Sequence, residues 1–449
     1  MTSTQFHGRV RRLGLAAGTL VVAGALGACN LDVSTPDVIP VDATAGKSAL
    51  PTLLAGASGD FSVGYGGYSN GDNSDAIIHV SGLLADEFIA SDFFSTHIGI
   101  DSRTATQTNG AILTVMQNLQ RSLVSANNTG ARYAQFSPKD AGFARVLNLA
   151  GFDYLFLGEN FCAEVPVGSV IDANGNIVGG QARTSVELFN LAASKFDSAA
   201  TVAQDAQDDL MLYTAQVGKG RALLDQGQYA QAASAVAGVP TDFVFTTEQG
   251  TTNDRTKNGL YELMWVNTRY TTADAEGGNG IPFVTSGDPR SATADLGTSI
   301  FDGATELFAP VKYGSYAAPV VIASGIEARL IEAEAALNAG NYGSAGGTLD
   351  ILNTLRATIG LTPLTAAATQ AAQVDQLFTE RAYWLFATAH RLGDLRRLIT
   401  QYGRPTETVF PTGDYFKGDK YGKEVNLPVP QEEQANSNFN RAKCDVTIP

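Results

Sequence analysis

The chain has 449 residues, of which 44% are hydrophobic and 17% are charged, so it carries enough apolar side chains for a large buried core. Its 45 acidic residues outnumber its 30 Lys and Arg, which gives a formal net charge of −15 at pH 7. An acidic surface repels the phosphates of nucleic acids and of anionic lipids, which argues against binding DNA, RNA or a lipid surface directly.

The first residues have the pattern of an export signal. Arg9, Arg11 and Arg12 precede an apolar stretch at 13–26, which is shorter than the roughly 20 residues that a membrane-spanning helix needs. We therefore predict a cleavable signal peptide at 1–28. Its removal takes away three Arg and no acidic residue, so the mature charge is −15 − 3 = −18.

A cysteine follows the apolar stretch directly, in Leu26-Gly27-Ala28-Cys29. This tetrapeptide matches the bacterial lipobox, and the match implies that Cys29 is the first mature residue and carries acyl chains such as palmitate. Several acyl chains on one residue give stable membrane anchoring. The alternative is an ordinary secretory signal with Cys29 as a bystander. Residues 29–46 are polar and interrupted by proline, which predicts a lipidated N-terminus and a flexible tether before a single domain at 47–449.

Helical hairpins dominate the rest of the chain. A glycine-rich stretch at 64–71 predicts a loop. Apolar residues at helical spacing then predict helices at 76–90, 143–157, 185–202, 213–224, 229–237, 322–340, 342–359 and 374–402. The pair at 213–237 resembles a tetratricopeptide unit, with small residues where the helices cross and a glycine turn between them.

Two inserts break this pattern, at about 238–320 and 403–449, and both are rich in Gly, Pro and Asn. Residues 170–178 predict a β-hairpin with an Asn-Gly turn, and 242–247 predict a short strand. The predicted fold is therefore mainly α, with tetratricopeptide-like helical hairpins, loop-rich inserts and short β-hairpins.

Two cysteines remain if Cys29 is acylated. An oxidising compartment favours a disulfide between Cys162 and Cys444, which would join segments 282 residues apart. The alternative is two free, buried thiols, because cysteine packs as a small hydrophobic residue.

Sequence patterns for catalysis, metal binding and phosphate binding are missing, so we predict no catalytic residue, no metal and no cofactor. Asp86 and Glu87 form an acidic pair of the kind that a glycosidase needs, but a structural ion pair is the simpler interpretation. His390 is surrounded by charged residues, and its spacing from Arg391 and Asp394 predicts a salt-bridge cluster.

Aromatic side chains in the predicted loops are the candidates for ligand binding, because rings can stack on sugar faces or grip peptides. The alternative is that they anchor the loops on the helical body. The candidates are Tyr65, Tyr68, Trp265, Tyr270, Tyr313 and Tyr316.

Residues 380–398, ERAYWLFATAHRLGDLRRL, resemble a segment of the SusD/RagB-like outer-membrane lipoproteins. Further matches, in the right order, are Glu327 to Ala335, Leu352-Asn353-x-x-Arg356, Asp288-Pro289-Arg290 and Leu427-Pro428-Val429-Pro430-x-x-Glu433. Thr388-Ala389 stands where the family usually has Glu-Gly. The resemblance implies a structural role, holding helices together, for Glu380, Arg381, Arg391, Asp394, Arg396 and Arg397.

The resemblance also implies a function and a location. Such a protein is a lipid-anchored lid, facing the cell surface, on a SusC-like TonB-dependent transporter of the outer membrane. It captures an oligosaccharide or a peptide and delivers it without covalent chemistry. Two alternatives stay open: a tetratricopeptide-type lipoprotein that scaffolds outer-membrane assembly, and an exported hydrolase.

Overall fold

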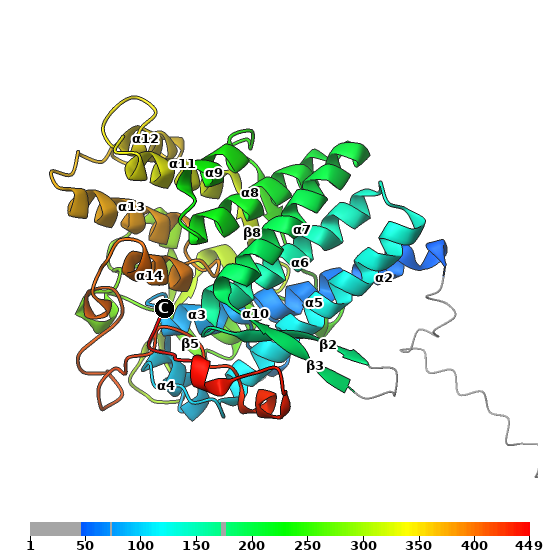
Figure 1. Ribbon diagram of the computed structural model, residues 1–449. Coiled ribbons are helices and arrows are strands. Elements are labelled where there is room, and N and C mark those ends of the chain that lie inside the picture. The colour runs from blue at the N-terminus through cyan, green and yellow to red at the C-terminus, as the bar shows by residue number, and fades with distance from the viewer. Residues whose placement is uncertain (1–45, 72–73, 172–176) are drawn as a thin grey trace, which may run out of the picture. The chain divides into compact units, whose positions relative to one another are not determined.

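The computed structural model describes residues 46–71, 74–171 and 177–449 (Figure 1). The predicted signal peptide, Cys29 and nearly all of the predicted tether lie outside these residues. Residues 47–449 form one compact unit.

Helices make up most of this unit, as the sequence predicts. Several begin at a side-chain cap: Asn109, Asp208 and Ser324 each accept a backbone N–H of the first turn. The helices are α2 Leu50–Gly66, α3 Ile77–Leu84, α4 Ser95–Asp101, α5 Gly110–Phe136, α6 Ala141–Asn160, α7 Ser185–Ala206, α8 Asp209–Asp225, α9 Tyr229–Val236, α10 Gly259–Tyr261, α11 Gly325–Asn338, α12 Thr348–Thr358, α13 Gln370–Trp384 and α14 Arg391–Thr400.

The long helices pack in chain order. α5 lies against α2 and α6, α6 against α7, α7 against α8, and α8 against α9 (Figure 1). α11 then continues the series, in contact with α9, α12 and α13. This succession of neighbouring hairpins is the tetratricopeptide-like arrangement predicted from the sequence.

The phenyl ring of Phe196, in the middle of the packed helices, requires a glycine on each of two neighbouring helices. The side chain of Phe196 on α7 is buried between α6 and α8. A Cβ atom at Gly151 or Gly218 would lie 2.6 or 2.4 Å from this ring, so only glycine allows the three helices to approach so closely.

Short antiparallel strand pairs connect the inserts to the helical body. One pair joins β5 of the 238–320 insert to the distant β1, and another joins β4, near the start of the insert, to β8, which follows its end. The four pairs are β1 Phe88–Ala90 with β5 Tyr270–Thr272, β2 Val165–Ile171 with β3 Ile177–Arg183, β4 Val244–Thr246 with β8 Val321–Ser324, and β6 Thr293–Thr298 with β7 Glu306–Pro310. The predicted Asn-Gly turn between β2 and β3 lies outside the described residues.

Several predicted boundaries are wrong. α2 extends to Gly66 into the predicted glycine-rich loop, and the helix predicted at 76–90 ends at Leu84, with a strand after it. The long helix α5 is not among the predicted elements. The helix predicted at 322–340 begins with the strand β8, because Val321–Ser324 pairs with the insert.

The largest correction concerns the helix predicted at 374–402, which is two helices with a break at 385–390. Ala387 and Ala389 have φ of +52° and +56° there, a left-handed conformation that ends a helix. Side chains from elsewhere satisfy the freed backbone groups: Tyr313 donates to the carbonyl of Ala387 at 2.9 Å, and Tyr65 to that of Thr388 at 3.1 Å. The break is thus held by tertiary contacts, which helical periodicity does not reveal.

The C-terminal segment crosses back to the β2–β3 hairpin (Figure 1). The backbone of Leu427 exchanges hydrogen bonds with Asn160 and Cys162, at 2.8 and 3.0 Å. Cys162 and Cys444 form a disulfide with their Cα atoms 5.0 Å apart. Asn436 and Asn438 donate to carbonyls of β3 at 2.9 Å. This segment therefore fastens the hairpin to the helical body.

Candidate functional site

Four aromatic residues gather on the surface where the 238–320 insert meets the end of α2. We call Tyr68, Tyr261, Trp265 and Tyr316 the aromatic cluster. α10 continues directly into a π-helical turn at Glu262–Val266, so Tyr261 and Trp265 lie on one wide turn. Such π-helical turns recur at functional sites.

Three rings of the cluster, those of Tyr261, Trp265 and Tyr316, contact one another. Tyr261 stacks on Trp265 with centroids 6.0 Å apart, and it meets Tyr316 edge to face at 4.7 Å. The ammonium group of Lys257 lies 4.9 Å from the centroid of the Tyr316 ring. All four aromatic side chains are half-buried, so part of each remains open to solvent.

The buried side chain of Glu262 holds the residues of this surface in place through hydrogen bonds. Its buried carboxylate accepts hydrogen bonds from Tyr316 at 2.8 Å, from Ser69 at 2.9 Å and from Asn267 at 2.9 Å. Burial and the neighbouring Glu262 raise the pKa of Tyr316 to about 12, so its hydroxyl keeps its proton at neutral pH. Trp265 is held by its indole N–H, which donates to the carbonyl of Pro310 at 3.2 Å. Anchored rings with exposed faces suit non-covalent binding of a flat or ring-shaped ligand.

The structure separates the six predicted ligand-binding aromatics into two groups. Trp265, Tyr316 and Tyr68 belong to the cluster. The hydroxyl of Tyr68 accepts a hydrogen bond from Asn70 at 2.8 Å, and the next residue, Ser69, donates to Glu262. The expectation that the other three lie in open loops is wrong, because their side chains are at most 2% exposed; they are Tyr65, Tyr270 and Tyr313.

Each buried tyrosine has a structural partner. Tyr65 donates to the carbonyls of Val321 and Thr388, and Tyr270 donates to Asp75. Tyr313 binds the carbonyl of Ala387. These hydroxyls hold the core and the helix break, so their rings cannot stack on a ligand.

Tyr261 and Glu262 complete the site and are not among the predicted residues. The signal was present in the sequence, because Tyr261 and Trp265 stand four residues apart and would share a helix face. The π-helical turn and the return of Tyr316 to Glu262 depend on the folding of the insert, which the spacing does not show.

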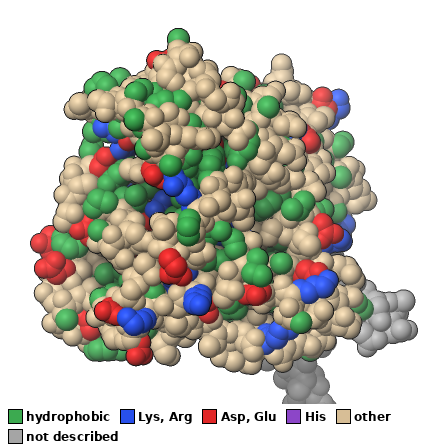
Figure 2. Space-filling view, turned by 60° about the vertical axis from the view of Figure 1, so that its left-hand side comes forward, with side chains coloured by type: hydrophobic (Ala, Val, Ile, Leu, Met, Phe, Trp, Pro, Cys, Tyr) green, Lys and Arg blue, Asp and Glu red, His purple; other side chains and the backbone are tan. Residues whose placement is uncertain are grey.

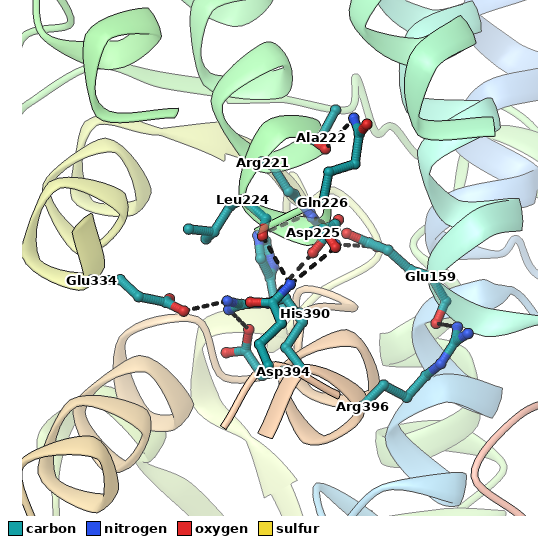
Figure 3. Close-up of polar contacts among 12 residues, drawn as sticks. Glu159, Arg221, Ala222, Leu224, Asp225, Gln226, Glu334, His390, Asp394 and Arg396 are labelled. Atoms are coloured by element: carbon teal, nitrogen blue, oxygen red, sulfur yellow. Dashed lines mark hydrogen bonds and ion pairs between the residues drawn. The ribbon is translucent and has the colours of Figure 1, made fainter. Parts of the chain in front are cut away.

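The charged residues of the motif at 380–397 do not lie at the aromatic cluster. They form a buried ionic network, part of which Figure 3 shows. Asp394 pairs with Arg381 at 2.8 Å and with Arg397 at 2.6 Å, and Arg397 also pairs with Glu334 of α11. Glu380 binds two arginines from other segments, Arg290 and Arg356, each at 2.5 Å. These contacts hold α11, α13 and α14 together.

His390 belongs to the same network. It lies 2.9 Å from a guanidinium nitrogen of Arg221 and 3.1 Å from Glu327. Burial, and then the positive charge of Arg221, lower the pKa of His390, so the imidazole is neutral at pH 7. The predicted charged cluster at His390 is thus present, but His390 contacts Arg221 and Glu327, which the spacing from Arg391 and Asp394 did not suggest.

The acidic pair Asp86 and Glu87 is fully buried. Asp86 pairs with Arg391, through Nε at 2.5 Å and Nη2 at 2.8 Å, and Glu87 accepts the N–H of Ala387 at 2.8 Å. Burial raises the pKa of Glu87 to about 7. Both carboxyl groups therefore support the helix break rather than face a cleft.

Hollows are present on the surface, and Figure 2 shows one with hydrophobic and basic side chains at its bottom. Within the part of the chain that the structure describes, no group of three or more His, Cys, Asp or Glu is placed to hold a metal ion. No helix in that part is long and apolar enough to cross a bilayer.

Comparison with solved structures identifies the fold. A SusD superfamily protein from Parabacteroides distasonis superposes with a TM-score of 0.66 at 13% identity, over 88% of this chain and 98% of that chain. A SusD-like carbohydrate-binding protein from Bacteroides fragilis gives 0.64 at 15% identity, over 88% and 99%. A laminarin-binding SusD-like protein gives 0.61 at 14% identity, over 88% and 98%.

The chain therefore has the SusD-like fold over nearly its whole described length, as the sequence motifs predict. No protein-family model matches the chain, and a search of curated proteins finds no match.

Proposed function

We propose that the protein is a SusD-like nutrient-binding lipoprotein that captures an oligosaccharide on the aromatic cluster and passes it to a membrane transporter. The observation that carries this proposal is the pair of stacked, half-exposed rings, Tyr261 and Trp265, beside Tyr316, which a buried glutamate holds, on a SusD-like fold. Aromatic faces of this kind pack against the apolar faces of sugar rings.

Two findings support a sugar over a peptide. The structures that share this fold include a carbohydrate-binding protein and a laminarin-binding protein. The only cation that lies over a ring of the cluster is Lys257, among the described residues, and it also pairs with Asp254 at 2.7 Å. A neutral ligand fits a surface whose charges are already paired.

The location follows from the N-terminal residues. An acylated Cys29 would anchor the protein to the outer membrane, and residues 30–46 would tether the helical body close to its partner. A tether raises the effective concentration of a lid over its channel. The partner we propose is a SusC-like TonB-dependent transporter. The protein would cover the channel of this transporter as a lid on the outer surface of the cell.

The ligand is tested by a glycan and peptide array probed with the purified protein. We expect signals on a set of related glycans, which the Trp265→Ala variant loses. Phe416→Ala is the matched control, because Phe416 is a 48% exposed ring on a different loop. Binding confined to peptides, or equal binding by the Trp265→Ala protein, would contradict the proposal.

The transporter is tested separately, by affinity purification from detergent-solubilised membranes. We expect a large β-barrel protein to co-purify with the acylated protein. Recovery of other outer-membrane assembly proteins without a transporter would favour the scaffold function instead.

A further inference from the structure

Arg396 differs from the other arginines of the ionic network. Each of Arg381, Arg391 and Arg397 pairs with a carboxylate, but among the described residues Arg396 forms no ion pair. Its Nη1 donates to the main-chain carbonyls of Gly158, at 3.0 Å, and of Glu159. Nε is buried without a hydrogen-bond partner in the described part of the chain, and both hydrogen bonds that this side chain donates there come from Nη1.

The residue is also 91% buried, because its relative exposure is 9%. Burial lowers the pKa of Arg396 to about 10, so the guanidinium remains charged at neutral pH. A buried charge is normally paired with a counter-charge, since desolvation of an isolated ion is costly.

The nearest acidic groups are engaged elsewhere. The carboxylate of Glu159 points away from Arg396 and binds Arg221, at 2.6 and 2.7 Å (Figure 3). Burial and the neighbouring Glu159 raise the pKa of Asp225 well above its ordinary value, and Asp225 lies 3.4 Å from Nε of Arg397. Both carboxyl groups favour the charged form of Arg396 from a distance, but among the described residues neither forms an ion pair with it.

Arg396 lines a cavity of about 200 Å³ between α14 and the start of α7. Its other walls include the apolar Val186 and Phe189, Gly393 and the hydroxyl-bearing Ser185, and the charged Arg397, Glu159 and Asp225 and the C-terminal Pro449 also line it. Ser185 and Val186 are the first residues of a 22-residue helix, whose dipole favours an anion. Thr184 caps the N–H of Glu187 in the first turn, whereas the N–H groups of Ser185 and Val186 have no partner within the helix.

We propose that this cavity binds a small organic acid. The carboxylate would accept two parallel hydrogen bonds from Nε and Nη2 of Arg396, the edge of guanidinium that matches a carboxylate. The apolar part of the acid would lie against Val186 and Phe189. This site is separate from the aromatic cluster, so it does not depend on the proposed function.

The first test is calorimetric titration of the purified protein with propionate and with propionamide. The two probes have the same shape and differ in charge. We expect saturable binding of propionate and binding of propionamide weakened by about tenfold or more. Equal binding of the two, or no saturable binding of propionate, would overturn the proposal.

Variants then locate the site. Arg396→Lys keeps the charge but loses the planar pair of donors, and we expect propionate affinity to fall about tenfold or more. Gly393→Val leaves Arg396 in place and narrows the cavity, because a Cβ at this position makes ordinary van der Waals contact with the side chain of Glu159, at 3.6–3.8 Å, without a clash. We expect the same loss of binding, with an unchanged circular dichroism spectrum.

Arg404→Gln is the control variant, because Arg404 pairs with Asp375 beside other cavities. Undiminished propionate binding by both Arg396→Lys and Gly393→Val would also overturn the proposal. A bound phosphate or sulfate that competes more strongly than propionate would show an inorganic anion site and contradict the assignment to organic acids.

Discussion

His97 lies between two buried carboxylates, with Nδ1 2.7 Å from Asp92 and Nε2 3.4 Å from Asp75. Burial alone lowers the pKa of this histidine, but the two carboxylates outweigh it and raise the pKa to about 9. Nδ1 of the nearby His79 accepts the backbone N–H of Ala76 at 3.1 Å, and burial outweighs the charge of Asp75 and lowers the pKa of His79 to about 4. We expect NMR titration to find His97 charged and His79 neutral at pH 7.5.

This difference has a consequence for stability. The folded pKa of His97 is above that of a free histidine, so its stabilisation is fully present below about pH 6.5 and is lost as the pH rises toward 9. We expect the unfolding free energy contributed by this site to fall by about 3 kcal/mol over that range. The measurement is urea denaturation at several pH values, and a His97→Gln variant with an unchanged pH profile would contradict it.

The pair between Asp86 and Arg391 is the second residue-scale prediction. Both side chains are buried, so Arg391→Met leaves an uncompensated carboxylate beside the helix break. We expect a loss of about 3–5 kcal/mol in unfolding free energy. The double variant Asp86→Asn/Arg391→Met should recover part of this loss in chemical denaturation. Equal stability of the single variant and the parent protein would contradict the structural role of the pair.

At the scale of elements, the helix break at 385–390 depends on hydroxyls from two other segments. We expect the double variant Tyr65→Phe/Tyr313→Phe to lose about 1–2 kcal/mol per hydroxyl. Hydrogen exchange should become faster in the break and stay unchanged in α7. Uniform acceleration across the molecule would show that the two hydroxyls stabilise the whole fold rather than the break.

The disulfide gives a further prediction at this scale. It closes a loop of 282 residues, and loss of so long a cross-link typically costs about 3–5 kcal/mol. We expect Cys162→Ser/Cys444→Ser to unfold at lower denaturant concentration and to exchange faster at 425–446. Alkylation of both thiols in the unreduced protein would instead show that the cross-link does not form.

These elements show what the sequence can and cannot predict. Apolar spacing correctly predicts α6, α7, α8 and α9, because each buries one continuous face against its neighbours. The same periodicity runs through 374–402, where the backbone nevertheless breaks, since the groups that hold the break come from positions up to 323 residues away. The motif at 380–397 predicted the fold correctly. Its charged side chains form the ion pairs that hold α11, α13 and α14 together, so the motif is tied to this arrangement of helices.

For the whole molecule, the limits of sequence reasoning are clearest among the aromatics. A tyrosine in a glycine-rich stretch looks the same in the sequence whether it is buried, as Tyr65 is, or half-exposed, as Tyr68 is. Only the packing of the insert against α2 distinguishes them. The same packing brings Tyr261 to Tyr316, residues 55 positions apart, and so creates the candidate binding surface.

The central claim is that this surface binds a glycan. The most direct measurement is calorimetric titration of the purified protein with the strongest glycan from the array, laminarin included among those tested. We expect saturable binding that Tyr261→Ala and Trp265→Ala each weaken about tenfold or more, while Phe416→Ala leaves it unchanged. Undiminished glycan binding by both cluster variants, or no binding of any glycan by the parent protein, would contradict it.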